Sequence, residues 1–140
     1  MEGRSGLVSQ WPDLLTELLL ARGVGVEAGL SCSEAAALLA TSGLMSHCLR
    51  ILLEPPAPTL AGALHTVGAL LKQLDETTEG PPRLLHGTGS SAWPLLDEAA
   101  RRGYGCRIGF EDVLELPNGE RAASNATLVR AARVRWPSTG

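Results

Sequence analysis

The sequence predicts an α/β fold in which short parallel strands alternate with the helices that cover them. Four short runs are apolar throughout, as expected for parallel strands buried on both faces. Each run is followed by an amphipathic segment with helical spacing, and one repeat takes about 25–30 residues, the usual size of a β/α unit. With 140 residues, 44% of them hydrophobic, the chain is long enough for one domain with a hydrophobic core.

Capping and stop signals place the elements along the chain. Pro12 and Asp13 suit the first turn of a helix, and Gly23 ends it. Ser31 and Glu34 fit a capping box at the start of the next helix, which Gly43 ends. Thr59 is expected to cap the helix after that. The expected elements are, in order, helix 11–22, strand 24–30, helix 31–42, strand 47–55, helix 59–74, strand 83–86, helix 93–102, strand 106–109 and helix 126–135.

Four strand–helix units amount to half of a TIM-type (β/α)8 barrel, which typically needs about 250 residues. We expect a lead-in at 1–10, a single half-barrel domain at 11–136 and a tail at 137–140. The alternative is a small, open, doubly wound sheet. The glycines at 23, 25 and 29 do not support a nucleotide-binding version of that sheet, because their spacing differs from the dinucleotide fingerprint.

Composition excludes several classes of function. The net charge is -3, no basic stripe is present, and there is one Tyr and one Phe, so we expect no nucleic-acid partner. No apolar run reaches the roughly 18–20 residues needed to span a bilayer, and the N-terminus lacks a signal-peptide pattern. Three scattered cysteines fit a reducing compartment. The sequence therefore predicts a cytoplasmic protein without a membrane partner.

A charged hexapeptide follows the last predicted strand and marks the candidate active site. Arg107, Glu111 and Asp112 stand at the mouth of a buried strand, where charges are costly unless they are paired or bound to a ligand. Ligands of parallel sheets bind at the carboxyl ends of the strands. The alternative is a structural ion pair between Arg107 and Glu111, since ion-pair networks also gather such charges.

Three acids, Glu27, Glu54 and Glu111, lie at or near predicted strand ends. If they converge on one rim, they suit a divalent metal or acid–base work. Alternatively, each acid caps a neighbouring helix or pairs with an arginine such as Arg50 or Arg107.

Gly87, Thr88 and Gly89 join the third predicted strand to a helix. Glycines let a ligand approach the backbone, and a helix N-terminus favours an anion. The alternative is a tight turn capped by serines. His86 on its own is interpreted as a hydrogen-bonded core histidine.

Segments 23–30, 52–55, 84–89 and 107–112 resemble the β-keto acid cleavage enzymes, typified by 3-keto-5-aminohexanoate cleavage enzyme. The likeness runs from about Leu14 to Arg133, and Arg107-Ile108-Gly109-Phe110-Glu111-Asp112 is its most specific part. It implies an amino-acid catabolic enzyme with a (β/α)8 barrel, of which this chain matches the C-terminal half. Such enzymes use a divalent metal, usually zinc, and condense a β-keto acid with acetyl-CoA, giving acetoacetate and a new CoA thioester.

The resemblance also implies roles for matched residues. Glu111 matches the metal-binding glutamate, Asp112 the catalytic base and Arg107 a catalytic arginine. Glu27 matches a supporting acid, and the loop 87–89 falls where a phosphate of coenzyme A could bind.

The family's metal-binding HxH motif is absent from the sequence. We therefore expect the isolated chain to be inactive and to need a partner half-barrel or a homo-oligomer. The alternative is a non-catalytic truncated remnant that self-associates or pairs with a partner half-barrel, because half-barrels expose sheet edges.

Overall fold

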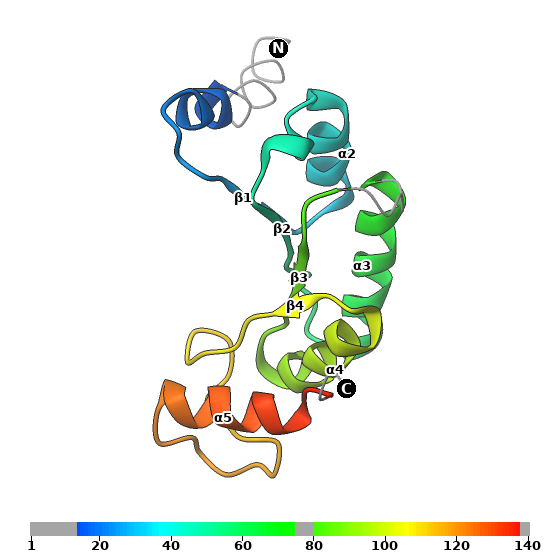
Figure 1. Ribbon diagram of the computed structural model, residues 1–140. Coiled ribbons are helices and arrows are strands. Elements are labelled where there is room, and N and C mark those ends of the chain that lie inside the picture. Colours follow the sequence, from blue (N-terminus) through cyan, green and yellow to red (C-terminus); the bar gives the residue numbers. More distant parts are fainter. Residues whose placement is uncertain (1–13, 75–79, 138–140) are drawn as a thin grey trace, which may run out of the picture.

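One parallel sheet with strand order β1-β2-β3-β4 forms the centre of the molecule (Figure 1). The computed structural model describes residues 14–74 and 80–137. The expected lead-in, the helix start at 11–13 and most of the expected tail lie outside these residues. Residues 14–21 are helical, and the other elements are β1 Glu27–Leu30, α2 Ser33–Ser42, η1 Met45–His47, β2 Arg50–Leu53, α3 Leu60–Leu74, β3 Arg83–Leu85, η2 Gly89–Ser91, α4 Ala92–Arg102, β4 Gly105–Cys106 and α5 Asn125–Arg135.

Every neighbouring pair of strands is parallel, which confirms the predicted α/β class. Leu53 stands opposite Leu30 on one side and Leu85 on the other, so the central strands are aligned at their carboxyl ends. The strand order follows the chain order without a switch point. A doubly wound sheet reverses its order at such a point, so that alternative is wrong.

The main core lies between the sheet and the helices on one of its faces. Figure 1 shows α2 and α3 along this face. Side chains alternate across a strand, so Ile51 and Leu53 of β2 face these helices. The buried cluster consists of Leu30, Ala36, Ile51, Leu53, Ala63, Val67, Leu70, Leu71, Leu74, Leu85, Leu95 and Ala99.

A second buried cluster holds the segment after β4 against the helices. It joins Trp93 and Leu96 of α4 to Val113 and to Leu128 of α5. The Trp93 indole Nε1–H donates a hydrogen bond to the Glu115 carbonyl, 2.9 Å away. This cluster fixes the hexapeptide 107–112 relative to the sheet, because the hexapeptide lies between β4 and Val113 in the chain.

Local signals were partly right about the helix ends. The Thr59 hydroxyl accepts a hydrogen bond from the Gly62 N–H, and Gly43 ends α2 with a left-handed conformation, as predicted. The capping box is wrong, because Cys32 is the N-cap of α2 and makes no side-chain capping bond. Cys48, predicted in a strand, follows η1 and is buried, and its burial raises the pKa of the thiol.

Candidate functional site

Four charged or titratable side chains meet at the carboxyl edge of the sheet. His86 stands between two acids: its Nε2 is 3.4 Å from Glu54 Oε2, and its Nδ1 is 3.2 Å from Asp112 Oδ1. Arg107 continues the row, since its Nη2 donates to the same Asp112 oxygen at 3.2 Å. The result is one connected series, Glu54–His86–Asp112–Arg107, which we call the edge cluster.

Strand geometry explains why three of these residues converge. Glu54, His86 and Arg107 are each the first residue after the carboxyl end of β2, β3 and β4. In β2 and β3, the residue before each of them faces the helices, so the side-chain alternation sends Glu54 and His86 to the opposite face. Equal positions on adjacent parallel strands lie side by side. This position was a usable signal in the sequence, but His86 was interpreted as a core histidine.

Asp112 reaches the cluster through a tight turn. The N–H groups of Asp112 and Val113 both donate to the Gly109 carbonyl, at 2.9 and 3.0 Å. The Asp112 carbonyl in turn accepts a bond from the Gly89 N–H at 2.8 Å. The Phe110 N–H donates to the Asn125 side chain at the start of α5. The acid is therefore held by the loop after β3 and by α5.

The centre of the edge cluster is buried, and two of its polar atoms lack a hydrogen-bond partner among the described residues. The side chains of Asp112 and His86 are 2% and 4% exposed. Among the described residues, His86 Nδ1 and Asp112 Oδ2 have no aligned hydrogen-bond partner, although Nδ1 lies close to Oδ1. An unsatisfied buried polar atom costs about 1–3 kcal/mol, and such groups often mark a functional site.

Arg107 carries the positive charge of the cluster. Its hydrogen bond to Asp112 raises the pKa of the guanidinium, so Arg107 is charged at every physiological pH. Its side chain is 37% exposed, in contrast to that of Asp112. Arg107 therefore has donors available to an anion from solvent while it remains anchored to a buried acid.

Glu54 and His86 face a pocket of about 360 Å³ beyond the strand ends, which Thr88, Pro55 and Ser31 also line. The Glu54 carboxylate lies over Gly29 of β1: a Cβ on Gly29 would stand 2.6 Å from Glu54 Oε1. The bare backbone of Gly29 thus leaves the space that the Glu54 side chain occupies beside His86.

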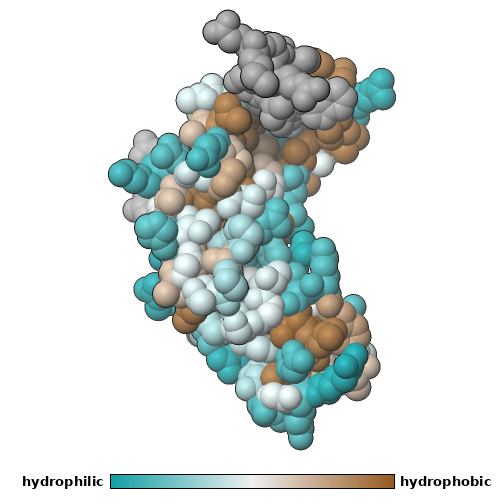
Figure 2. All heavy atoms as spheres, turned by 180° about the vertical axis from the view of Figure 1, so that it is seen from behind, coloured by the Kyte–Doolittle hydropathy of each residue, from teal (hydrophilic) through white to brown (hydrophobic). Residues whose placement is uncertain are grey.

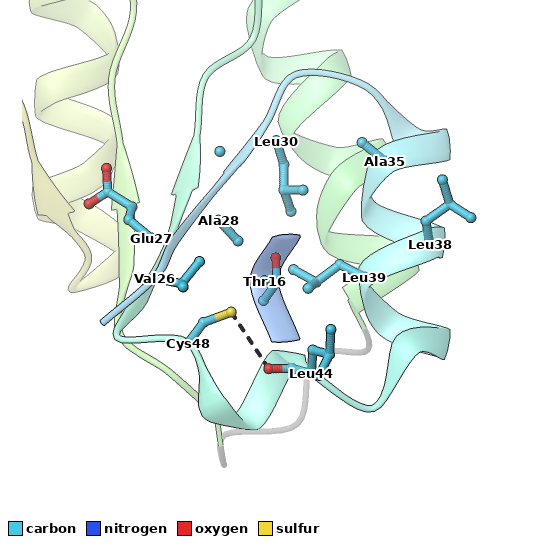
Figure 3. A pocket seen from close by; sticks show the side chains of 11 residues that line it. Thr16, Val26, Glu27, Ala28, Leu30, Ala35, Leu38, Leu39, Leu44 and Cys48 are labelled. Atoms are coloured by element: carbon cyan, nitrogen blue, oxygen red, sulfur yellow. Dashed lines mark hydrogen bonds between the residues drawn. The ribbon is translucent and has the colours of Figure 1, made fainter. Parts of the chain in front are cut away.

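The expected placement of Glu27 at this rim is wrong. Glu27 is the first residue of β1 and lies opposite Arg50, with which it forms an ion pair. Figure 3 shows its carboxylate pointing away from the other residues drawn there. Strand β1 starts later than the sequence indicated, so the acid lies at the amino end of the sheet. The structure confirms the alternative interpretation of Glu27, in which this acid pairs with an arginine.

Glu111 was the expected metal ligand. It is paired with Arg107 at 3.0 Å, and its side chain is 82% exposed. Within residues 14–74 and 80–137, no three His, Cys, Asp or Glu side chains form a group that could hold a metal. A catalytic zinc ion takes three protein ligands. The described residues therefore do not fit a metal ion without further ligands.

The loop 87–89 packs closely against α4 and binds Asp112 of the edge cluster. A Cβ on Gly87 would stand 2.6 Å from Ser91 Oγ and 2.7 Å from Leu95 Cδ1, so this glycine permits close contact with α4. Gly89 has a φ of 55°, and its N–H is already bonded to Asp112. Thr88 is exposed and lines the pocket, which leaves it as the loop residue available to a ligand.

Replacing Gly87 with alanine is expected to destabilise the protein by about 1–3 kcal/mol, the usual cost of overpacking. The new methyl group would meet the Ser91 backbone carbonyl at 2.8 Å, which cannot move freely. Gly68 in α3 is the matched control: its Cβ would meet nothing within 4 Å. Gly68→Ala is expected to stabilise the helix by about 0.5–1 kcal/mol. Urea unfolding of both variants measures the difference, and equal effects would contradict the packing role of Gly87.

The fold and the edge cluster define a class: an α/β protein built of consecutive β/α units, with its polar site at the carboxyl ends of parallel strands. Residues 29–136 match the family model described as beta-keto acid cleavage enzyme. The chain belongs to this family, which assigns it a β-keto acid cleavage-type function at the family level. No curated protein is similar enough to count as a match. Among the described residues, no helix is both long and apolar enough to cross a membrane.

Proposed function

We propose that this chain acts in the condensation of a β-keto acid with acetyl-CoA, which yields acetoacetate and a new CoA thioester. The observation that carries the proposal is the edge cluster, which joins Arg107 and Asp112 of the family-matched hexapeptide to His86 and Glu54. Its position at the carboxyl edge of a parallel sheet is where enzymes of this architecture bind their substrates.

In this proposal Arg107 binds the carboxylate of the β-keto acid and holds the negative charge that develops on it. The resemblance implies that Asp112 is the base, and in this proposal it acts through His86. Because its side chain is buried and His86 lines the pocket, the proton passes from substrate C2 to His86 Nε2, while Asp112 stabilises the imidazolium through Nδ1. Glu54, beside Nε2, orients the ring.

The C2 carbanion then attacks the thioester carbon of acetyl-CoA and displaces the CoA thiolate. The thiolate attacks the original keto carbon, the bond from that carbon to C2 breaks, and C2 takes back a proton. Acetoacetate and the new thioester leave.

Three expectations from the sequence enter the proposal without a role in these steps. Thr88, at the pocket, is the loop residue placed to contact a coenzyme A phosphate. The zinc ion that the resemblance implies needs ligands in addition to Glu111, and no step above depends on it. The four parallel strands with helices on one face correspond to the C-terminal half of a (β/α)8 barrel, completed by a partner half-barrel or a second copy.

The experiment follows the first chemical step alone. Acetoacetate is incubated with the protein in D2O, and exchange of its C2 protons is recorded by NMR against buffer. We expect exchange faster than in buffer, but no CoA-thioester formation by the isolated chain. Exchange at the buffer rate would overturn the proposal and favour the second candidate, a non-catalytic family member. One observation favours this second candidate: the described residues contain no group of three side chains that could hold a metal ion.

A further inference from the structure

Among the described residues, the sheet has an unpaired strand edge at each end. Among the described residues, β1 and β4 each have one strand neighbour, so each leaves an open backbone edge. Open edges of this kind pair with further strands unless they are covered. Figure 1 shows the helix at residues 14–21 beyond β1, and α5 beyond β4. The two ends therefore differ in what they present next to their open edges.

The β1 end presents an apolar ridge. Leu14, Leu15 and Leu18 of the helix at 14–21 are each at least half exposed, at 56%, 50% and 53%. Glu17 lies between them in the sequence, is exposed, and is the only charged residue in the described range 14–21. We call these four residues the leucine ridge. Three exposed leucines on two turns of helix form a contiguous apolar patch of the kind that marks an interaction site.

The β4 end presents a hollow of about 330 Å³ between β4 and α5. Its apolar lining includes Ile108, Val129 and Trp136, and Arg107 and Arg133 complete its wall. Helix α5 contains no acidic residue, and neither Arg130 nor Arg133 forms an ion pair with any described residue. We call this surface the α5 hollow. Figure 2 shows hydrophobic surface near both ends of the molecule, with polar surface between them.

The two surfaces complement each other in shape and charge. The ridge projects leucines around one acid, whereas the hollow is apolar and has arginines at its wall. They lie at opposite ends of the same sheet, so one molecule cannot bring them together. Two copies related by a two-fold axis can, because each ridge then meets the hollow of the other copy and both open edges are used at once.

We propose that a second copy of this chain docks here, with the leucine ridge of each copy in the α5 hollow of the other. The contact brings β1 of one copy beside β4 of its partner. All strands run parallel in chain order, so the two edges point in the same direction and continue one sheet. This inference rests on the proposed completion of the half-barrel by a second copy, and Arg107 belongs both to the wall of the hollow and to the edge cluster. Its test requires no substrate, so its failure is distinguishable from failure of the proposed reaction.

The test is a charge exchange across the contact. Glu17→Arg places an arginine against Arg133 of the other copy, and Arg133→Glu places two acids together. Each variant alone is expected to raise the dimer dissociation constant about tenfold or more, since about 1.4 kcal/mol corresponds to tenfold. An equimolar mixture is expected to restore the dimer, because both junctions then pair opposite charges. Analytical ultracentrifugation over a concentration series measures the wild type, the two variants and their mixture.

Leu15→Gln removes an apolar contact from the ridge and is expected to weaken the dimer as well. Leu60→Gln is the control, because Leu60 is also exposed but begins α3, away from both surfaces. Circular dichroism establishes that the variants remain folded. A wild type that is monomeric throughout, an oligomer insensitive to both charge variants, or a mixture that stays monomeric would each overturn the proposal. A series of species larger than the dimer would contradict the two-fold closure.

Discussion

Exchange of the acetoacetate C2 protons is expected to slow by about 10²–10⁴-fold when Asp112 is replaced with asparagine, the range by which a positioned general base contributes. Asparagine keeps the size of the side chain and can still contact Arg107, but it carries no negative charge. His86 then loses the carboxylate 3.2 Å from its Nδ1 that stabilises its protonated form. The imidazole therefore becomes a weaker proton acceptor at Nε2.

Three further variants separate this explanation from simple loss of structure. His86→Gln is expected to slow exchange by a similar factor, because both residues act in one proton-transfer unit, and the double variant is expected to be no slower than either single variant. Glu115→Gln is the control, since Glu115 is exposed and lies outside the edge cluster. Multiplying defects in the double variant, or unchanged exchange in Asp112→Asn, would refute the shared role. Thermal unfolding of each variant reports whether the fold persists.

Replacing Leu53 with alanine is expected to destabilise the protein by about 2–5 kcal/mol, a large part of the total stability of a domain of this size. Leu53 is fully buried in β2, between Leu30 and Leu85 of the flanking strands, and it packs in the main core with α3. Truncation removes contacts to both neighbouring strands and to the helices. The cavity cannot close easily, because parallel strands hold their spacing through backbone hydrogen bonds.

Leu84→Ala provides the matched comparison. Leu84 is a neighbour of Leu85 in β3, but it faces the other side of the sheet and is only partly buried. Its truncation is expected to cost clearly less than that of Leu53. Urea denaturation gives both free energies of unfolding. Equal costs would show that both faces of the sheet are packed to the same degree, contrary to the one-sided core described above.

The sequence was sufficient for the class of fold and for the stretch that carries the site. Apolar runs and helical spacing located all four strands, because each strand is a short apolar run followed by a helix. Arg107 and Asp112 were found because charges beside a buried strand are physically expensive, and the structure joins them. Thr59 was recognised as a cap since its hydroxyl bonds the backbone locally, within three residues.

What failed depended on distances that a sequence does not contain. Glu27 was assigned to the wrong end of β1 because the sequence predicted a strand over the whole run 24–30, whereas pairing with β2 begins only at Glu27 itself. The role of His86 in the edge cluster was not predicted, because its two carboxylate neighbours, at positions 54 and 112, lie far from it in the chain. Gly87 was interpreted as giving a ligand access to the backbone, but its contacts are with Ser91 and Leu95.

The overlap between position 29 and the Glu54 carboxylate couples the choice of residue at two positions on neighbouring strands. Any side chain at 29 would claim the volume that Glu54 Oε1 now fills, 2.6 Å from where the new methyl would stand. A family member with alanine there would have to shorten its acid at 54 or turn it away from the histidine. Substitutions at these two sites should therefore be inherited together, and a library that randomises both should recover them as matched pairs.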